Sequence, residues 1–261
     1  IPTLIKLKSY LTVFKLVCRF IKNEQIRQAF SIQPLLLGGN PIETTSIYNL
    51  IHFLERKWGV HYAMGGTGKI IKSLEQLMKE EDISIKKNHE VTKILVEQDK
   101  AIGITANKKK VFANKIIMNT DPAFTYKYLI NSKKNRKWKK KRIEGMDFSM
   151  GLFVIYFGTD KIYNDVAHHT IWMGNRYEGL LKDIFRNQIL ADDFSLYLHR
   201  PTATDNSMAP KNCDCFYVLS PVPNLKKPID WENNAKTYQD KILLALEKTI
   251  LPGLRKNLKI C

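Results

Sequence analysis

Residues 148–159, FSMGLFVIYFGT, contain no charged side chain and are rich in aromatic and β-branched residues. Such a run predicts a buried β-strand. Residues 193–199 predict a second strand, in which apolar and polar side chains alternate, and residues 215–219 predict a third. Residues 231–258 place apolar side chains at helical spacing, so a helix is expected to accompany the strands. We therefore expect an α/β fold of the α+β kind.

A different pattern occupies residues 83–118. Short β-branched runs are separated there by polar turns, which predicts a meander of strands. The runs are 83–85, 91–96, 101–105, 111–112 and 116–118. The last run leads directly into Asn119, Thr120, Asp121 and Pro122. Open sheets typically bind ligands where a strand ends in polar residues, so this junction is a candidate binding site.

The first part of the chain is expected to be mainly helical. Residues 4–30 mix Lys and Arg with apolar side chains at a period near 3.6, which predicts a basic amphipathic helix. A second helix is expected over residues 44–58, ending near Gly59. A third is expected after the glycine turn at residues 65–68. That turn could present backbone N–H groups to a phosphate, but a tight entry turn is the favoured interpretation.

The charge balance indicates an anionic partner. The 261 residues include 42 Lys and Arg against 25 Asp and Glu, a formal net charge of +17. This charge suits a membrane surface or nucleic acid, and the basic run 133–142 fits either of them or a solvated segment. Of the cationic residues 33 are Lys and 9 are Arg. Lys lacks the planar fork that reads bases, so specific nucleic-acid recognition is not expected.

Cysteine content and hydropathy bear on location. Four Cys are too few for a disulfide scaffold, which favours a reducing, cytoplasmic setting. The longest charge-free run, 28–42, is broken by Pro34 and two glycines and is too short to span a bilayer. We expect peripheral attachment to a membrane through apolar side chains of the first helix, such as Phe14 and Val17. Because the chain begins at Ile1 without a leader pattern, a piece of a longer protein is expected.

Familiar catalytic and metal-binding motifs are missing from the sequence. No GxSxG or HExxH pattern occurs. His168 and His169 are adjacent, and neighbouring side chains on a strand point to opposite faces, so no metal site is expected. Arg176, Asp192 and Asp193 could lie as polar groups in an apolar pocket or form an ordinary surface ion pair.

Several segments together resemble the bacterial-type phytoene desaturases of carotenoid synthesis. They follow the order of that family, at nearly constant spacing, from about residue 2 to the end of the chain. The segments are IRQAFSIQPLLLGGNPIETTSIYNLIHFLERKWGV, MGGTG, MNTDPAFTY, GLFVIYFG, AHHT, NRYEGLLKDIF, ADDFSLYLH, VLSPVPNL and LPGLR. A single glycine turn would not be evidence for membership of this family, because such turns are common. Agreement of so many separate segments in the same order is specific to the family.

The resemblance implies the central part of a two-domain, FAD-dependent oxidoreductase of the amine-oxidase-like flavoprotein superfamily. Such an enzyme removes hydrogen from a linear C40 carotene such as phytoene, toward lycopene, at a membrane surface. Residues 1–68 would be a helical, substrate- and membrane-facing segment, 69–121 part of the FAD domain, and 122–261 the substrate-binding domain. The family's N-terminal GxGxxG fingerprint and C-terminal flavin segment are missing here, which implies an internal fragment that does not bind FAD by itself.

The resemblance also implies site residues. Val91 would meet the adenine end of FAD, and Asn119, Thr120 and Asp121 would lie near the cofactor. Asp193 and Arg176 fall in matching segments and are candidate catalytic residues, which could stabilise positive charge on the polyene or accept a proton.

A hydrocarbon substrate offers no polar group, so we expect a long apolar channel with the strands at 152–157 and 194–198 as walls. The alternatives are a related carotene desaturase, isomerase or oxidase, since a scaffold does not fix a function. A different class of alternative is a non-enzymatic module that binds lipid or nucleic acid through residues 6–22 and 133–142.

Overall fold

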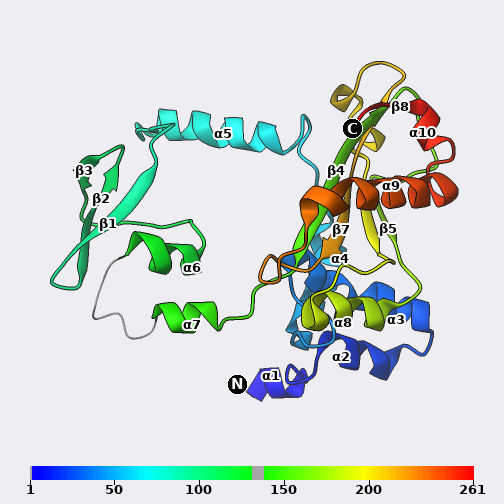
Figure 1. The fold of residues 1–261 in the computed structure, drawn as a ribbon, viewed down its shortest axis with the longest axis horizontal. Helices are drawn as coiled ribbons and strands as arrows, with labels where there is room; N and C mark the ends of the chain where they lie inside the picture. Colours follow the sequence, from blue (N-terminus) through cyan, green and yellow to red (C-terminus); the bar gives the residue numbers. More distant parts are fainter. Residues whose placement is uncertain (1, 131–137) are drawn as a thin grey trace. The chain divides into compact units, whose positions relative to one another are not determined.

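The computed structural model describes residues 2–130 and 138–261, which form two compact units (Figure 1). The first unit comprises Ile1–Lys72 and Ser149–Cys261, and the second comprises Ser73–Phe148. The α-helices are α1 (Pro2–Lys6), α2 (Val13–Phe20), α3 (Glu24–Ser31), α4 (Leu50–Trp58), α5 (Thr67–Glu80), α6 (Pro122–Phe124), α7 (Lys140–Glu144), α8 (Tyr177–Lys182), α9 (Trp231–Thr249) and α10 (Leu254–Asn257). The strands are β1 (Val91–Glu97), β2 (Lys100–Ala106), β3 (Lys109–Phe112), β4 (Gly151–Thr159), β5 (His169–Trp172), β6 (Leu196–His199), β7 (Asp214–Val222) and β8 (Leu258–Ile260). Short 3-10 or π turns are η1 (Gln33–Leu37), η2 (Ser46–Asn49), η3 (Thr125–Leu129), η4 (Asp183–Asn187), η5 (Pro201–Ala203) and η6 (Asn206–Met208).

The first unit is built on a five-stranded antiparallel sheet. Its strand order is β5-β6-β7-β4-β8, and the long strands β4 and β7 pair along their whole lengths. The predicted strands at 148–159, 193–199 and 215–219 correspond to β4, β6 and β7. Helices and antiparallel strands occur together, so the expected α+β fold class is confirmed.

One face of this sheet carries the hydrophobic core. Alternate residues of β4, β6 and β7 point toward α9 because successive side chains of a strand alternate between faces. The buried set on the strands is Ile155, Phe157, Leu196, Leu198, Phe216, Val218 and Val222, and the facing residues of α9 are Tyr238, Ile242, Leu243 and Leu246. Burial of these apolar side chains stabilises the unit at about 25 cal/mol per Å² removed from water.

A buried ion pair fixes the end of β7. The Arg200 guanidinium and the Asp214 carboxylate are 6% and 0% exposed. Arg200 Nε donates to both carboxylate oxygens, at 3.0 and 2.9 Å, and the backbone N–H of Tyr163 donates to Oδ2 at 2.8 Å. Thr202 donates its hydroxyl to Oδ1. Because both charges are hydrogen-bonded, their burial is tolerated, whereas removal of one partner would leave an unpaired charge in the core.

The first thirty residues form three helices instead of the single helix expected over 4–30. Thr12 caps the N-terminus of α2 by accepting from Lys15 N, and Asn23 caps α3 by accepting from Ile26 N. Each cap residue has an extended backbone, so the helical pattern is interrupted there. The prediction that Val17 inserts into a membrane is wrong, since this side chain is buried.

Phe14 is also poorly placed to insert into a membrane. It is half-buried, and its ring lies 6.2 Å from the ring of Tyr177 on α8. Tyr177 in turn shares a 2.8 Å hydrogen bond between its hydroxyl and that of Ser31 at the end of α3. Burial raises the pKa of Tyr177 to about 12.

Within the part of the chain that the structure describes, no helix is both long and apolar enough to cross a bilayer.

The second unit contains a three-stranded meander, β1-β2-β3. The predicted runs at 83–85 and 116–118 are not strands, because among the described residues neither pairs with a neighbouring strand. Ile117 is accordingly 96% exposed. At Gly103 a Cβ atom would lie 2.4 Å from the carbonyl oxygen of Val111, so the close approach of β2 and β3 at this point requires glycine.

The compact units and the expected domains divide the chain at different residues. The meander lies within the expected FAD segment 69–121, but residues 122–148, expected in the substrate-binding domain, lie with the meander in the second unit. Residues 133–137 of the expected basic run lie outside the described residues. The helix expected over 44–58 is present as η2 followed by α4, and Gly59 ends it with a φ of 77°.

Candidate functional site

The face of the five-stranded sheet that is turned away from α9 is partly open, and it is called the open face below. Cross-strand register arranges its side chains in rows. The first row, from β5 to β4, is His169, His199, Tyr217 and Tyr156, and the second is Ile171, Tyr197, Leu219 and Val154. A shorter third row is Pro221 and Leu152. The open face therefore has a histidine- and tyrosine-rich row beside an apolar area.

Hydrogen bonds hold the rings at the β5–β6 end of the open face. The hydroxyl of Tyr197 lies 2.6 Å from His169 Nδ1 and 3.3 Å from His199 Nδ1. The Nδ1 atom of His168 lies 2.5 Å from the hydroxyl of Thr204. One hydroxyl group thus contacts the Nδ1 atom of each histidine ring, which fixes the ring orientations.

The surroundings of the histidines favour their neutral forms. Burial lowers the pKa of His199 to about 4, and the neighbouring His168 and His169 add to this effect. Burial also lowers the pKa of His168, with a further contribution from His169. The pKa of the Tyr197 hydroxyl is raised, first by burial and then by the Tyr217 hydroxyl. At neutral pH the two histidines and Tyr197 are therefore uncharged, and each can still donate and accept hydrogen bonds.

The expectation that His168 and His169 point apart is wrong. β5 begins at His169, so His168 precedes the strand and is free of its alternation. The two ring centroids are 4.4 Å apart, and those of His168 and His199 are 4.6 Å apart. One nitrogen from each of the three rings lies within 4.8 Å of the others. The reason given against a metal site, divergent side chains, therefore does not apply.

Tyr62 covers this cluster from the segment before α5. Its ring meets the ring of His168 edge-on, with centroids 4.8 Å apart. The Tyr62 hydroxyl and His168 Nε2 are buried and have no hydrogen-bond partner among the described residues. Burial is the largest of the causes that raise the pKa of Tyr62. Two polar atoms without partners are costly in a folded protein, which marks the position as a candidate for ligand contact.

The glycine turn at the start of α5 is an entry turn. Gly65 and Gly66 have φ values of 85° and 78°, which glycine adopts without strain. The Gly65 N–H donates to the Asp205 carboxylate at 2.6 Å. The protein's own carboxylate thus takes the amide that would have contacted a phosphate. Hydrogen bonds from Ser207 and then from Gly65 lower the pKa of Asp205.

The proposed catalytic pair is brought together at another part of the unit. Arg176 Nη2 lies 2.5 Å from Asp193 Oδ1 and 3.0 Å from Asp183 Oδ2. Arg176 stands at the N-cap of α8, and Asp193 precedes β6, whereas His199 ends that strand. The second oxygen of Asp193 is buried and has no partner among the described residues. The arrangement is that of an ion pair between α8 and the loop before β6.

The expected cofactor residues all belong to the second unit. Val91 opens β1 and is half-buried, while Asn119 is exposed. Asp121 caps α6 by accepting from Phe124 N at 2.9 Å, and the Thr120 and Thr125 hydroxyls are hydrogen-bonded. The β1 strand contacts η3, which follows these residues in the chain. The structure thus puts both expected parts of the cofactor site into one unit.

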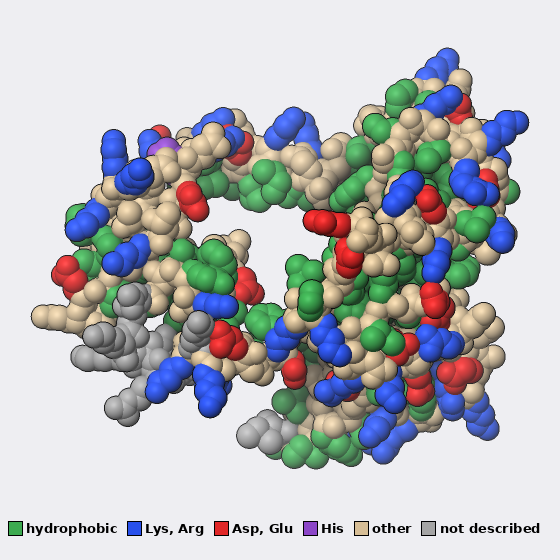
Figure 2. All heavy atoms as spheres, in the orientation of Figure 1, with side chains coloured by type: hydrophobic (Ala, Val, Ile, Leu, Met, Phe, Trp, Pro, Cys, Tyr) green, Lys and Arg blue, Asp and Glu red, His purple; other side chains and the backbone are tan. Residues whose placement is uncertain are grey.

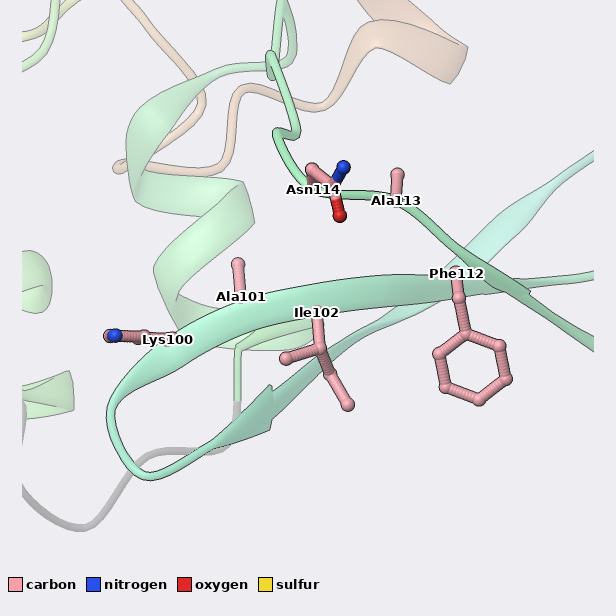
Figure 3. A pocket seen from close by; sticks show the side chains of 6 residues that line it. All are labelled: Lys100, Ala101, Ile102, Phe112, Ala113 and Asn114. Atoms are coloured by element: carbon pink, nitrogen blue, oxygen red, sulfur yellow. The ribbon is translucent and has the colours of Figure 1, made fainter.

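A shallow pocket lies beside the meander of the second unit (Figure 3). Its lining residues are Lys100, Ala101, Ile102, Phe112, Ala113 and Asn114. In the close view Ala101 and Ala113 point to one side, and Ile102 and Phe112 point to the other. The residues expected to meet FAD are not among its lining residues.

Sequence reasoning missed most of the open face. The alternation of residues 193–199 was a usable signal, because it places Tyr197 and His199 on the face opposite Leu198. Nothing in the sequence pattern indicated that Tyr217 would lie beside His199. Tyr62 comes from a loop far away in the sequence, and its contact with His168 depends on tertiary structure.

Comparisons with known proteins give consistent results. The fold resembles the crystal structure of an oxidoreductase from Methanosarcina mazei, with a TM-score of 0.68 and 21% identity over 95% of this chain and 54% of that one. A phytoene desaturase (lycopene-forming) of Pseudescherichia vulneris is 41% identical over 98% of this chain and 53% of its own length. A phytoene desaturase (neurosporene-forming) of Rhodobacter capsulatus is 39% identical over 99% and 51%. A 4,4'-diapolycopen-4-al dehydrogenase of Metabacillus indicus is 31% identical over 99% and 51%.

No protein-family model matches the chain. The structural likeness shows that this chain has the fold of about half of that protein. By sequence the chain is a relative of the bacterial phytoene desaturases, as the collinear motifs indicated. It spans about half the length of the curated relatives that it matches.

Proposed function

We propose that the protein containing this chain is an FAD-dependent oxidoreductase that desaturates a linear carotene, such as phytoene, toward lycopene. The observation that carries the proposal is 41% identity over 98% of the chain to a phytoene desaturase (lycopene-forming). A diapolycopen-4-al dehydrogenase is also similar to the chain, at 31% identity, which is less than the 41% of the phytoene desaturase. Oxidation of a carotene aldehyde is therefore the second candidate function.

The open face is the surface that we assign to the substrate. Its second and third rows offer apolar or aromatic side chains, and Leu152 and Val154 are 49% and 37% exposed. A row across four strands measures about 14 Å at the usual strand spacing, which matches part of a long polyene. A hydrocarbon would bind there by burying apolar area, with aromatic rings as flat contact surfaces.

The second unit fits one part of an FAD site. Asn119 is exposed and can donate and accept hydrogen bonds, and residues 115–119 follow the meander without forming a helix or strand. Val91, Thr120 and Asp121 complete the proposed set. A bound flavin would accept the hydrogen removed from the carotene, while the chain's own residues would orient the nucleotide and the polyene.

A catalytic part for Asp193 or Arg176 stays a prediction. Their 2.5 Å contact supports a simpler role, in which the ion pair ties α8 to the loop before β6. On the open face, the neutral His199 and the Tyr197 hydroxyl are polar groups beside the apolar rows.

Peripheral attachment to a membrane is also proposed, through apolar side chains of the first 20 residues other than Phe14 and Val17. Leu4, Ile5 and Leu7 at the N-terminal end of the chain, together with Phe20 on α2, are exposed. Figure 2 shows hydrophobic side chains in the region of α1, with Lys and Arg side chains nearby. Lys6, Lys8, Lys15 and Arg19 lie among them in the sequence. Apolar side chains surrounded by cations suit insertion into an anionic bilayer surface.

The experiment is an assay of the full-length protein with FAD and phytoene in liposomes. Each new double bond lengthens the conjugated chain, so the products absorb visible light and can be separated by chromatography. Coloured products that depend on FAD would support the proposal. A full-length protein that binds no flavin, or that binds flavin and leaves phytoene unchanged, would refute it.

A further inference from the structure

Three histidines meet at the β5–β6 end of the open face. His169 begins β5, His199 ends β6 opposite it, and His168 lies just before β5. One nitrogen from each ring lies within 4.8 Å of the other two. We propose that His168, His169 and His199 form a binding site for a divalent transition-metal ion of the zinc type.

The distances are suitable for one ion. Three atoms that lie within 4.8 Å of one another can all be reached from a central point at most about 2.8 Å away. Zinc–nitrogen bonds are about 2.0–2.1 Å long, so ring shifts of less than about 1 Å complete the coordination.

The hydrogen bonds of the rings select the ligand atoms. In metal sites, a coordinating histidine donates its second ring N–H to a carboxylate, carbonyl or water, which fixes the tautomer. Thr204 lies at His168 Nδ1, and Tyr197 lies at the Nδ1 atoms of both His169 and His199. Hydroxyl oxygens can accept these N–H groups in the same way. The Nε2 atoms are then the metal ligands.

An unpartnered atom supports this choice independently. His168 Nε2 is buried and has no hydrogen-bond partner among the described residues. A buried nitrogen without a partner costs free energy, and a bound cation would remove that cost. The ring of Tyr62 packs edge-on against His168 and shields this side of the site, while His169 is exposed and leaves a path for the ion.

The ligand set determines which ions bind. Three imidazoles suit Zn²⁺, Cu²⁺, Ni²⁺ and Co²⁺, whereas Mg²⁺ and Ca²⁺ require oxygen ligands. Three protein ligands also leave a fourth tetrahedral position for water or another small ligand. Because the cluster ends the first row of the open face, an occupied site would place a cation beside the surface that we assign to the carotene.

The test measures Zn²⁺ binding to the 261-residue chain by competition with a chromogenic chelator, and Co²⁺ binding by its visible spectrum. We expect one Zn²⁺ per chain with a micromolar or lower dissociation constant, no comparable binding of Mg²⁺, and a Co²⁺ spectrum of a four-coordinate site. His199→Gln should weaken Zn²⁺ binding at least tenfold. His89→Gln, an exposed histidine of the second unit, should leave it unchanged.

Exposed His169 provides a second variant in case His199→Gln does not fold. His169→Gln should also weaken binding at least tenfold, with a circular dichroism spectrum like that of the wild type. Zn²⁺ binding weaker than millimolar would overturn the proposal. Equal binding by the wild type and by a folded histidine variant would overturn it too, because the Zn²⁺ ligands would then lie elsewhere in the chain.

Discussion

The imidazole of His199 stacks on the ring of Tyr217, with centroids 4.5 Å apart and ring planes 21° apart. The two residues are a cross-strand pair of β6 and β7. Tyr217 also pairs with Tyr156 of β4, at a centroid distance of 5.7 Å. Aromatic pairs across strands stabilise the sheet and fix its register. The polar row of the open face is therefore held by the same pairing that builds the core on the other face.

The depressed pKa of His199 makes stability depend on pH. Its pKa in the folded chain is about 4, below the value of about 6.5 for an unfolded histidine. The unfolded state therefore binds a proton first as the pH falls, so stability declines from about pH 6.5 to about pH 4. We expect the urea midpoint to fall less in His199→Gln than in the wild type between pH 7.5 and 4.5, with EDTA present.

His61→Gln is the control for this measurement, because His61 is exposed. Its midpoint should follow the wild type at every pH. Parallel curves for the wild type and His199→Gln would show that the folded state does not disfavour the protonated ring.

The buried ion pair gives a stability prediction. Asp214→Ala leaves the Arg200 guanidinium buried without its carboxylate, so the free energy of unfolding should fall by about 3–5 kcal/mol. Asp240→Ala removes one partner of an exposed pair with Lys236 and should cost less than about 1 kcal/mol. Urea denaturation measures both values. Similar small losses in the two variants would contradict the role assigned to Asp214.

Membrane attachment can be tested with liposomes. Leu7→Ser and Phe20→Ser remove exposed apolar side chains and should reduce sedimentation with anionic liposomes. Ile260→Ser, on β8, removes an equally exposed side chain from another surface and should not. Binding by the wild type should weaken as salt rises, because the Debye length is about 10 Å at 0.1 M. Unchanged sedimentation of the Leu7 and Phe20 variants would argue against attachment by this surface.

Substitution of Asp193 distinguishes a catalytic role of this residue from a purely structural one. If Asp193 acts on the carotene, Asp193→Asn in the full-length protein should lower turnover about 10²- to 10⁴-fold, at wild-type flavin content and melting temperature. If it only holds α8, the melting temperature should fall and activity should follow the amount of folded protein. Turnover numbers, flavin absorbance and thermal melts of the same preparation distinguish the two results.

Most of the secondary structure was predictable from local pattern. The charge-free run at 148–159 predicted β4, and the alternation of 193–199 predicted β6. The single helix expected over 4–30 was wrong, although Thr12 and Asn23 are residue types that begin helices. The apolar spacing continued across the breaks, so periodicity alone did not reveal them.

The site was less predictable because it depends on pairing between distant strands. Register places Tyr217 beside His199, and register is a tertiary property. His168 lies just outside β5, so the alternation of side chains along a strand, from which opposite directions were expected, does not apply to it. The ion pair of Arg176 and Asp193 could be proposed from charge alone, but its contact with Asp183 could not.

The turnover of Val154→Asp in the full-length protein shows whether the carotene binds on the open face. Val154 is 37% exposed in the second row, and Ile162, outside the sheet strands, is 40% exposed and serves as the matched control. A carboxylate in an apolar wall should raise KM for phytoene and lower kcat/KM at least tenfold, while Ile162→Asp stays near wild type. Flavin content and melting temperature should be unchanged in both. Equal kcat/KM values for the two variants would contradict binding on the open face.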